Sequence, residues 1–211
     1  MDPRKLITIV VAHGYNVESP DWNFVFEGDL ETGRLGRGPK ALYVALCEQA
    51  DYMLWNTGNS RALWNGREFI EGEYSYRFAC DHIDEWMHAF PHHFGGFARS
   101  IIEEFLQDDR RHIFEHVSRN TLGSALEAYP ILDGLIGENP AHVISVSSRN
   151  HLRVAHHFPM ILQQGHGRVG PLRSKVLRVS TEWADTGYAD DGGMEFVQIN
   201  ERSGEDRYAP K

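Results

Sequence analysis

Five short apolar runs, rich in valine and isoleucine, recur along the 211-residue chain and alternate with segments of helical periodicity. The runs cover residues 6–12, 51–56, 112–117, 141–147 and 175–180. Their near-continuous hydrophobicity is typical of strands that are covered on both faces. Strands that alternate with helices join in parallel through right-handed crossovers. The sequence therefore predicts an α/β fold, namely a three-layer Rossmann-like doubly wound sheet, mainly parallel, with about five core strands.

The segments between the runs have the apolar spacing of amphipathic helices. They cover residues 39–50, 76–90, 97–107, 121–136 and 151–163. No repeat or linker divides the chain, so we expect a single domain over residues 1–211. The Gly- and Asp-rich residues 181–211 are expected to form an irregular C-terminal extension.

Charge and cysteine content limit the partners of this chain. Its 21 basic and 30 acidic side chains give a formal charge of -9, which would repel nucleic acid over most of the surface. A small anionic ligand in a local basic pocket remains compatible with that charge. The first apolar run is too short to span a membrane, so we expect no membrane partner. Cys47 and Cys80 lack metal-binding spacing and fit buried free thiols in a reducing compartment, which predicts a cytoplasmic protein.

Polar residues follow the fourth apolar run, where an open parallel sheet binds its ligands. Ligand sites in such sheets lie beyond the carboxyl ends of the strands. Ser147 and Ser148 end this run, and His151 and Arg153 follow at the start of a predicted helix near Asn150. Backbone N–H groups at a helix N-terminus favour an anion. We therefore place a candidate ligand site here.

The other three strand-to-helix junctions carry polar or glycine residues as well. Three polar residues precede the helix at the third junction, and helix capping explains one of them but not all three. Gly58 permits close approach of the backbone in the second junction. The candidate ligand-binding residues of these junctions are His13, Gly14, Arg37, Asn56, Gly58, Ser118, Asn120 and Thr121.

The long segment from Asn16 to Gly36 is expected to be a lid loop, because loops of this length inside a domain usually have a binding role. Trp22, Phe24 and Phe26 either cover a ligand ring or pack the loop against the body of the protein. We expect the segment to lie over the cleft and to move more than the sheet.

Several common chemistries lack their sequence signatures. The chain has 12 histidines but no HExxH motif and no Cys/His quartet, so no metal site is predicted. It has no GxSxG nucleophile elbow, no phosphate-binding loop of the GxxxxGK[ST] type, and no GxGxxG directly after the first strand. The common serine-hydrolase and nucleotide-binding classes are therefore disfavoured.

Three short motifs, in their order along the chain, resemble the ElyC/SanA/YdcF family. They are the RxxxA of Arg37 to Ala41, the SxNT of Ser118, Asn120 and Thr121, and a strand followed by HxxRA, altered here to SSRNHLRVA. Gly123 and Ser124 replace the Glu-Asn pair that usually follows SxNT in the family. The resemblance implies a Rossmann-like domain with a polar cleft, suggested in some relatives to bind S-adenosylmethionine. The membrane segment and the envelope role of many relatives are not carried over.

The sequence leads to two hypotheses for function. The first is a soluble enzyme acting on a phosphorylated, nucleotide-like or adenosyl-containing small molecule, as a hydrolase or transferase. In it, Arg37 and Arg153 neutralise the anion, His151 is the general acid or base, and Glu115 orients His151 or Arg153. The alternative is a non-catalytic module that binds S-adenosylmethionine or a nucleotide in the same cleft. No sequence feature separates the two, because both need the same hydrogen-bond donors.

Overall fold

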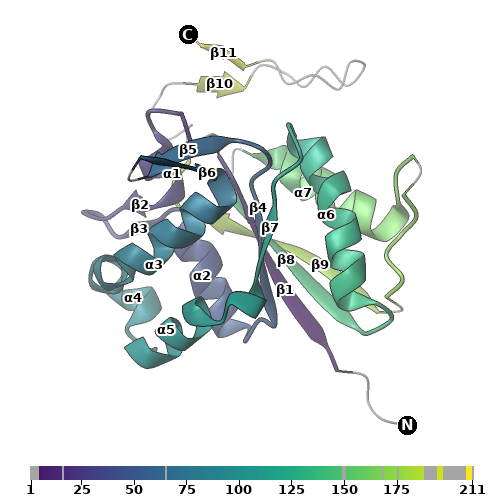
Figure 1. The fold of residues 1–211 in the computed structure, drawn as a ribbon, viewed down its shortest axis with the longest axis horizontal. Coiled ribbons are helices and arrows are strands. Elements are labelled where there is room, and N and C mark those ends of the chain that lie inside the picture. The colour runs from purple at the N-terminus through teal and green to yellow at the C-terminus, as the bar shows by residue number, and fades with distance from the viewer. Residues whose placement is uncertain are drawn as a thin grey trace.

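A five-stranded, fully parallel sheet forms the centre of the protein (Figure 1). The computed structural model describes residues 5–15, 17–64, 66–148, 151–167, 169–174, 176–187, 194–196 and 208–210. The strands lie in the order β7-β4-β1-β8-β9, and every neighbouring pair is parallel. The predicted fold class is thereby confirmed. The strands are β1 (Ile7–His13), β4 (Tyr52–Asn56), β7 (His112–Glu115), β8 (Ala141–Ser148) and β9 (Leu177–Ala184).

Helices cover both faces of this sheet because successive strand residues point to opposite sides. In β1, Val10 and Ala12 pack into one apolar cluster, whereas Ile9 and Val11 pack into the other. Figure 1 shows α1 to α5 on the first face and α6 and α7 on the second. The helices are α1 (Trp22–Phe26), α2 (Arg37–Cys47), α3 (Glu71–Ala89), α4 (Pro91–Phe94), α5 (Arg99–Gln107), α6 (Thr121–Ile136) and α7 (Leu152–Gln164).

The strand order creates a crevice between β1 and β8. From β1 the chain runs outward to β4 and β7 through helices on one face, and it returns to β8 and β9 through α6 and α7 on the other. The connections after β1 and β8 therefore leave the sheet on opposite faces. In open α/β sheets this arrangement opens a ligand crevice at the carboxyl ends of the two strands.

Several short strands and a 3₁₀ helix lie outside the central sheet and its helices. In the described part of the chain, short antiparallel strand pairs and a 3₁₀ helix occur beside the core elements: β2 (Gly28–Asp29) with β3 (Arg34–Leu35), β5 (Arg61–Trp64) with β6 (Arg67–Ile70), β10 (Met194–Phe196) with β11 (Tyr208–Pro210), and η1 (Asp109–Arg111). The C-terminal extension, expected from residue 181, starts later because β9 pairs with β8 as far as Ala184. Most of the remaining extension lies outside the described residues. None of the described helices has the length and apolar character that crossing a bilayer requires.

Residues 17–36 differ from the irregular lid expected there. They form α1 and the β2–β3 hairpin, and Trp22 and Phe26 are buried in the core rather than held over a ligand. Residues after β9 fasten the segment, since Thr186 Oγ1 donates a hydrogen bond to the Phe24 carbonyl at 2.8 Å. Of the two alternatives for these rings, packing against the body of the protein is confirmed for Trp22 and Phe26, because the apolar core offers them more burial than a polar cleft. Asn16 lies outside the described residues.

Both cysteines are free, as expected, but neither is fully buried. Cys47 is exposed at the end of α2, and Cys80 is half-buried in α3. The prediction that both thiols are buried is therefore wrong.

Candidate functional site

A polar cavity of about 210 Å³ lies at the carboxyl ends of the strands on either side of the β1–β8 crevice. Polar side chains and glycine dominate its wall, unlike the mainly apolar walls of most small-molecule pockets. A ligand here would be held by hydrogen bonds and charge. The wall consists of His13, Gly14, Tyr15, Asn56, Thr57, Asn59, Ser60, Glu71, Ser118, Arg119, Asn120, Thr121, Ser124 and His151.

The cavity brings together residues predicted from all four junctions. Those that line it are His13, Gly14, Asn56, Ser118, Asn120, Thr121 and His151. The other predicted residues are not among those that line it: Arg37, Gly58, Glu115, Ser147, Ser148 and Arg153. The predicted junctions therefore converge, but about half of the residues predicted to bind ligand do not line the cavity. Arg149 and Asn150 lie outside the described residues.

His13 ends β1 and is held as a neutral imidazole. Its Nε2 lies 2.7 Å from Ser145 Oγ, its Nδ1 lies 3.4 Å from Asn56 Nδ2, and its ring packs edge-on against Phe158. Burial, and to a smaller extent the nearby charge of Arg37, lowers the pKa of His13 to about 3. His13 therefore stays uncharged at neutral pH and shapes the cavity without exchanging protons.

His151 lies just before α7, between two hydroxyl groups. Its Nε2 is 2.9 Å from Thr121 Oγ1, and its Nδ1 is 3.2 Å from Ser147 Oγ. Burial is the main cause that lowers the pKa of His151 well below its usual value, followed by the charge of Arg37. A group so hard to protonate is a poor general acid at neutral pH. The structure therefore favours a neutral His151 over the expected general acid, and its role as a base stays a prediction.

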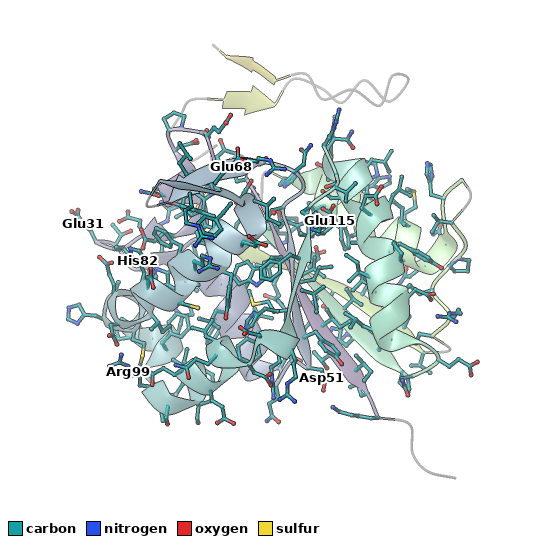
Figure 2. All side chains as sticks on the ribbon, viewed as in Figure 1. Glu31, Asp51, Glu68, His82, Arg99 and Glu115 are labelled. Atoms are coloured by element: carbon teal, nitrogen blue, oxygen red, sulfur yellow. The ribbon has the colours of Figure 1, made fainter. Side chains whose placement is uncertain are left out.

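Glu115 organises the turn after β7 rather than His151. Its carboxylate accepts hydrogen bonds from Val117 N at 2.7 Å, from Ser118 N at 2.8 Å, and from Ser118 Oγ at 2.7 Å. It also accepts one from Gly58 N at 3.2 Å, which ties the β4 and β7 junctions together. Figure 2 shows Glu115 at the end of the central sheet, between the two helical layers. These hydrogen bonds of Glu115 go to the β4 and β7 junctions, so its expected role in orienting His151 or Arg153 stays a prediction.

Arg37 links the two strands that border the crevice. It is 1% exposed, its Nε donates to Ser148 Oγ at 2.8 Å, and its Nη1 donates to the Gly14 carbonyl. Its guanidinium also lies 5.4 Å from the centre of the Tyr15 ring. The predicted anion-binding residue is thus a buried cross-link behind the wall. Its charge still acts on the cavity, since it influences the ionisation of His13 and His151.

Glu71 is an ionisable residue of the cavity that the sequence did not predict. It is the first residue of α3, which begins five residues earlier than predicted, and it is only 1% exposed although it lines the cavity. Its Oε1 accepts a hydrogen bond from Tyr15 N at 2.7 Å. Burial raises the pKa of Glu71 to about 7, while that hydrogen bond and the charge of Arg37 oppose the rise. Glu71 can therefore both accept and donate a proton near neutral pH.

The remaining missed residues gave no distinct signal in the sequence. Tyr15, Thr57, Asn59, Ser60 and Arg119 lie in ordinary loop sequence, and Ser124 lies near the start of α6. An acidic residue such as Glu71 in the first turn of a helix is common on electrostatic grounds alone. Arg119 is exposed at the cavity wall, with no ion pair among the described residues. These residues come together only because the tertiary structure brings their loops to one edge of the sheet.

No metal-binding group is visible in the described part of the chain, where no three His, Cys, Asp or Glu side chains come close enough to hold an ion.

Comparisons with known protein families, with curated proteins and with solved structures each found no match. The site must therefore be interpreted from its own geometry.

Proposed function

We propose that this chain is an enzyme that acts on a small anionic ligand in the polar cavity, as a hydrolase or a transferase. The observation that carries the proposal is Glu71, a buried carboxyl group with a pKa of about 7 in the wall of a polar cavity. Phosphorylated, nucleotide-like and adenosyl-containing molecules are the ligands that we expect. The order of the motifs around Arg37, Ser118 and His151 supports a relationship to the ElyC/SanA/YdcF family.

The charges around the cavity support an anionic ligand. The N-termini of α3 and α6, at Glu71 and Thr121, lie at the wall, and helix N-termini carry partial positive charge. Arg119 adds a full positive charge at the same wall, and Arg37 adds one behind it. Local attraction of an anion is compatible with the negative overall charge, because salt screens charges beyond about 8 to 10 Å.

Glu71 supplies the proton transfer in this proposal. As a carboxylate it takes the proton of a water molecule or an acceptor hydroxyl while that oxygen attacks the ligand, and as a carboxylic acid it returns the proton to the leaving group. His13 and His151 remain neutral and shape the wall, because both ring nitrogens of each already contact side chains of the protein.

Anion binding is tested by thermal shift with inorganic phosphate, ATP, glucose 6-phosphate and S-adenosylmethionine. A ligand at about 100 times its Kd should stabilise the protein by about 2.7 kcal/mol and raise its Tm. Arg119→Ala should weaken binding of the best ligand by about tenfold, since a charge-assisted hydrogen bond contributes about 1.5 kcal/mol or more. Arg178→Ala, at the opposite end of the sheet, is the matched control and should bind normally. Equal affinity in both variants would contradict the proposed anion site.

Catalysis is tested by product analysis with each ligand that binds. Glu71→Gln should keep binding within a fewfold but lower turnover by about a hundredfold, because the amide cannot exchange a proton. The wild-type rate should depend on a group with an apparent pKa of about 7, and the variant should lose that dependence. A ligand that binds through Arg119 but is never converted would instead identify a non-catalytic binding module.

A further inference from the structure

Two neighbouring residues at the end of β4 each bury a polar atom without a hydrogen-bond partner. Asn56 Oδ1 and Thr57 Oγ1 are both inaccessible to solvent, and neither has a partner among the described residues. Both residues line the cavity. Buried polar groups in folded proteins are nearly always paired, so two adjacent exceptions at a cavity indicate that something else pairs with them.

The neighbours of Asn56 determine which kind of partner it needs. The Asn56 side-chain nitrogen lies 3.4 Å from His13 Nδ1, and the other nitrogen of that ring lies 2.7 Å from Ser145 Oγ. These contacts are consistent with an imidazole that accepts at Nδ1 from the amide and donates from Nε2 to the hydroxyl. The amide nitrogen of Asn56 is then engaged, and its oxygen is left as an acceptor. An acceptor needs an N–H or O–H donor, which a bare phosphate dianion does not provide.

Glu71 closes the same corner of the cavity. A Cβ atom at Gly14 would lie 2.8 Å from both Glu71 Oε1 and the Cβ of Thr57, so these two side chains meet across the glycine. A Cβ atom at Gly72 would come within 3.0 Å of Thr57 Oγ1. The two glycines thus leave the corner free of side chains of their own, and its polar groups are two acceptors and one hydroxyl.

The charges around this corner determine whether its donor is a neutral hydroxyl group or a positively charged ammonium group. Arg37 acts electrostatically on both Glu71 and His13, and Arg119 lines the cavity. His13, His151 and Tyr15 are the other ionisable groups at this wall, and they add no negative charge at neutral pH. The Glu115 carboxylate behind the wall already accepts hydrogen bonds from Gly58, Val117 and Ser118. Because Arg37 already acts on Glu71, a second cation beside this carboxyl group would be repelled. A neutral hydroxyl group satisfies the same acceptors without that repulsion.

We propose that Asn56, Thr57 and Glu71 form a subsite for the hydroxyl groups of a sugar, beside the anion subsite at Arg119 and the start of α6. The inference rests on the proposed function and narrows its ligand class to phosphorylated sugars, including the ribose phosphate of nucleotides. Asn56 and Glu71 accept hydrogen bonds from the sugar hydroxyls, and the Thr57 hydroxyl pairs with one of them.

The test compares affinities of the full-length protein for inorganic phosphate, ribose 5-phosphate, glucose 6-phosphate and the two free sugars, by titration calorimetry. Wild type should bind at least one sugar phosphate at least tenfold more tightly than phosphate. Thr57→Val, which removes the hydroxyl while keeping the shape, should reduce that preference at least threefold and leave the phosphate Kd unchanged. Thr57→Ser should restore the preference. Thr181→Val, outside the cavity, is the matched control and should behave as wild type.

The possible results differ in whether they contradict the sugar subsite, the proposed anionic ligand, or both. Sugar phosphates that bind no more tightly than phosphate, or a Thr57→Val variant that weakens phosphate and sugar phosphate equally, would overturn the sugar subsite while leaving the anion site intact. Free sugars that bind with dependence on Thr57, in a protein that binds no phosphate, would support the subsite and overturn the anionic ligand. A protein that binds none of the probes would overturn both. Circular dichroism confirms that each variant is folded.

Discussion

Replacing Gly58 by Ala is expected to lower the free energy of unfolding by about 3 kcal/mol or more. Gly58 has a φ of 72°, a conformation that costs a residue with a Cβ about 1 to 2 kcal/mol. The added Cβ would also lie 2.4 Å from the backbone oxygen of Ser118, so the β4 and β7 junctions must separate. That separation strains the hydrogen bonds from Gly58 N to Glu115 and from Asn59 N to the Ser118 carbonyl. Denaturant unfolding followed by circular dichroism measures the loss.

Gly66→Ala is the matched control for this prediction. Gly66 has a φ of 75°, but a Cβ there would meet nothing within 4 Å. It should therefore cost only the conformational part, about 1 to 2 kcal/mol. Equal losses in the two variants would show that the contact between the β4 and β7 junctions is not held as tightly as described. Because these junctions carry Asn56, Thr57 and Ser118, Gly58→Ala should also weaken ligand binding, whereas Gly66→Ala should not.

His13→Gln is expected to make the protein relatively more resistant to acid. The pKa of His13 is about 3 in the folded protein and 6.5 as its ordinary value, so the unfolded chain takes up a proton at a higher pH than the folded one. The contribution of His13 to stability is therefore complete above pH 6.5 and is lost as the pH falls toward 3. At pH 4 the loss is about 3 kcal/mol, at 1.36 kcal/mol per pH unit. Glutamine takes up no such proton, so the variant avoids this loss. Between pH 7 and pH 4, the free energy of unfolding of the variant should therefore rise by about 3 kcal/mol relative to that of wild type.

Glu71 changes the stability with pH in the opposite direction to His13, so the variant must be compared with wild type at each pH. Its pKa of about 7 lies above the ordinary 4.5, so its contribution is complete below pH 4.5 and is lost as the pH rises through 7. The two groups partly cancel in wild type but not in the difference between wild type and His13→Gln. His116→Gln, at an exposed position, is the matched control for the histidine-to-glutamine change and should not reproduce this shift. A constant difference for His13→Gln would contradict the buried, neutral state of this imidazole.

The sequence by itself determined the architecture of the protein. Each apolar run was long enough to specify a strand buried on both faces, and the helical spacing between runs implied parallel connections. The ends of α6 and the start of β8 agree with the predicted residues, because local capping at Asn120 and local hydrophobicity at Ala141 decide them. The convergence of His13, Asn56, Ser118 and His151 followed as well, since the carboxyl ends of parallel strands share one edge of the sheet.

Only the tertiary structure decided what each polar side chain does at that edge. In sequence, Glu71 is an ordinary first-turn acid, and its raised pKa arises because packing against the β1 junction removes it from water. In the same way, Glu115 accepts hydrogen bonds from the turn that follows it, and Arg37 is buried where it joins Gly14 and Ser148. Trp22 packs in the core, which decides between the two alternatives left open for its ring. Protonation and hydrogen-bond choice depend on groups brought together from distant parts of the chain. The local pattern that specifies a strand or a helix contains no information about those partners, so the fold could be predicted while the roles of the site residues could not.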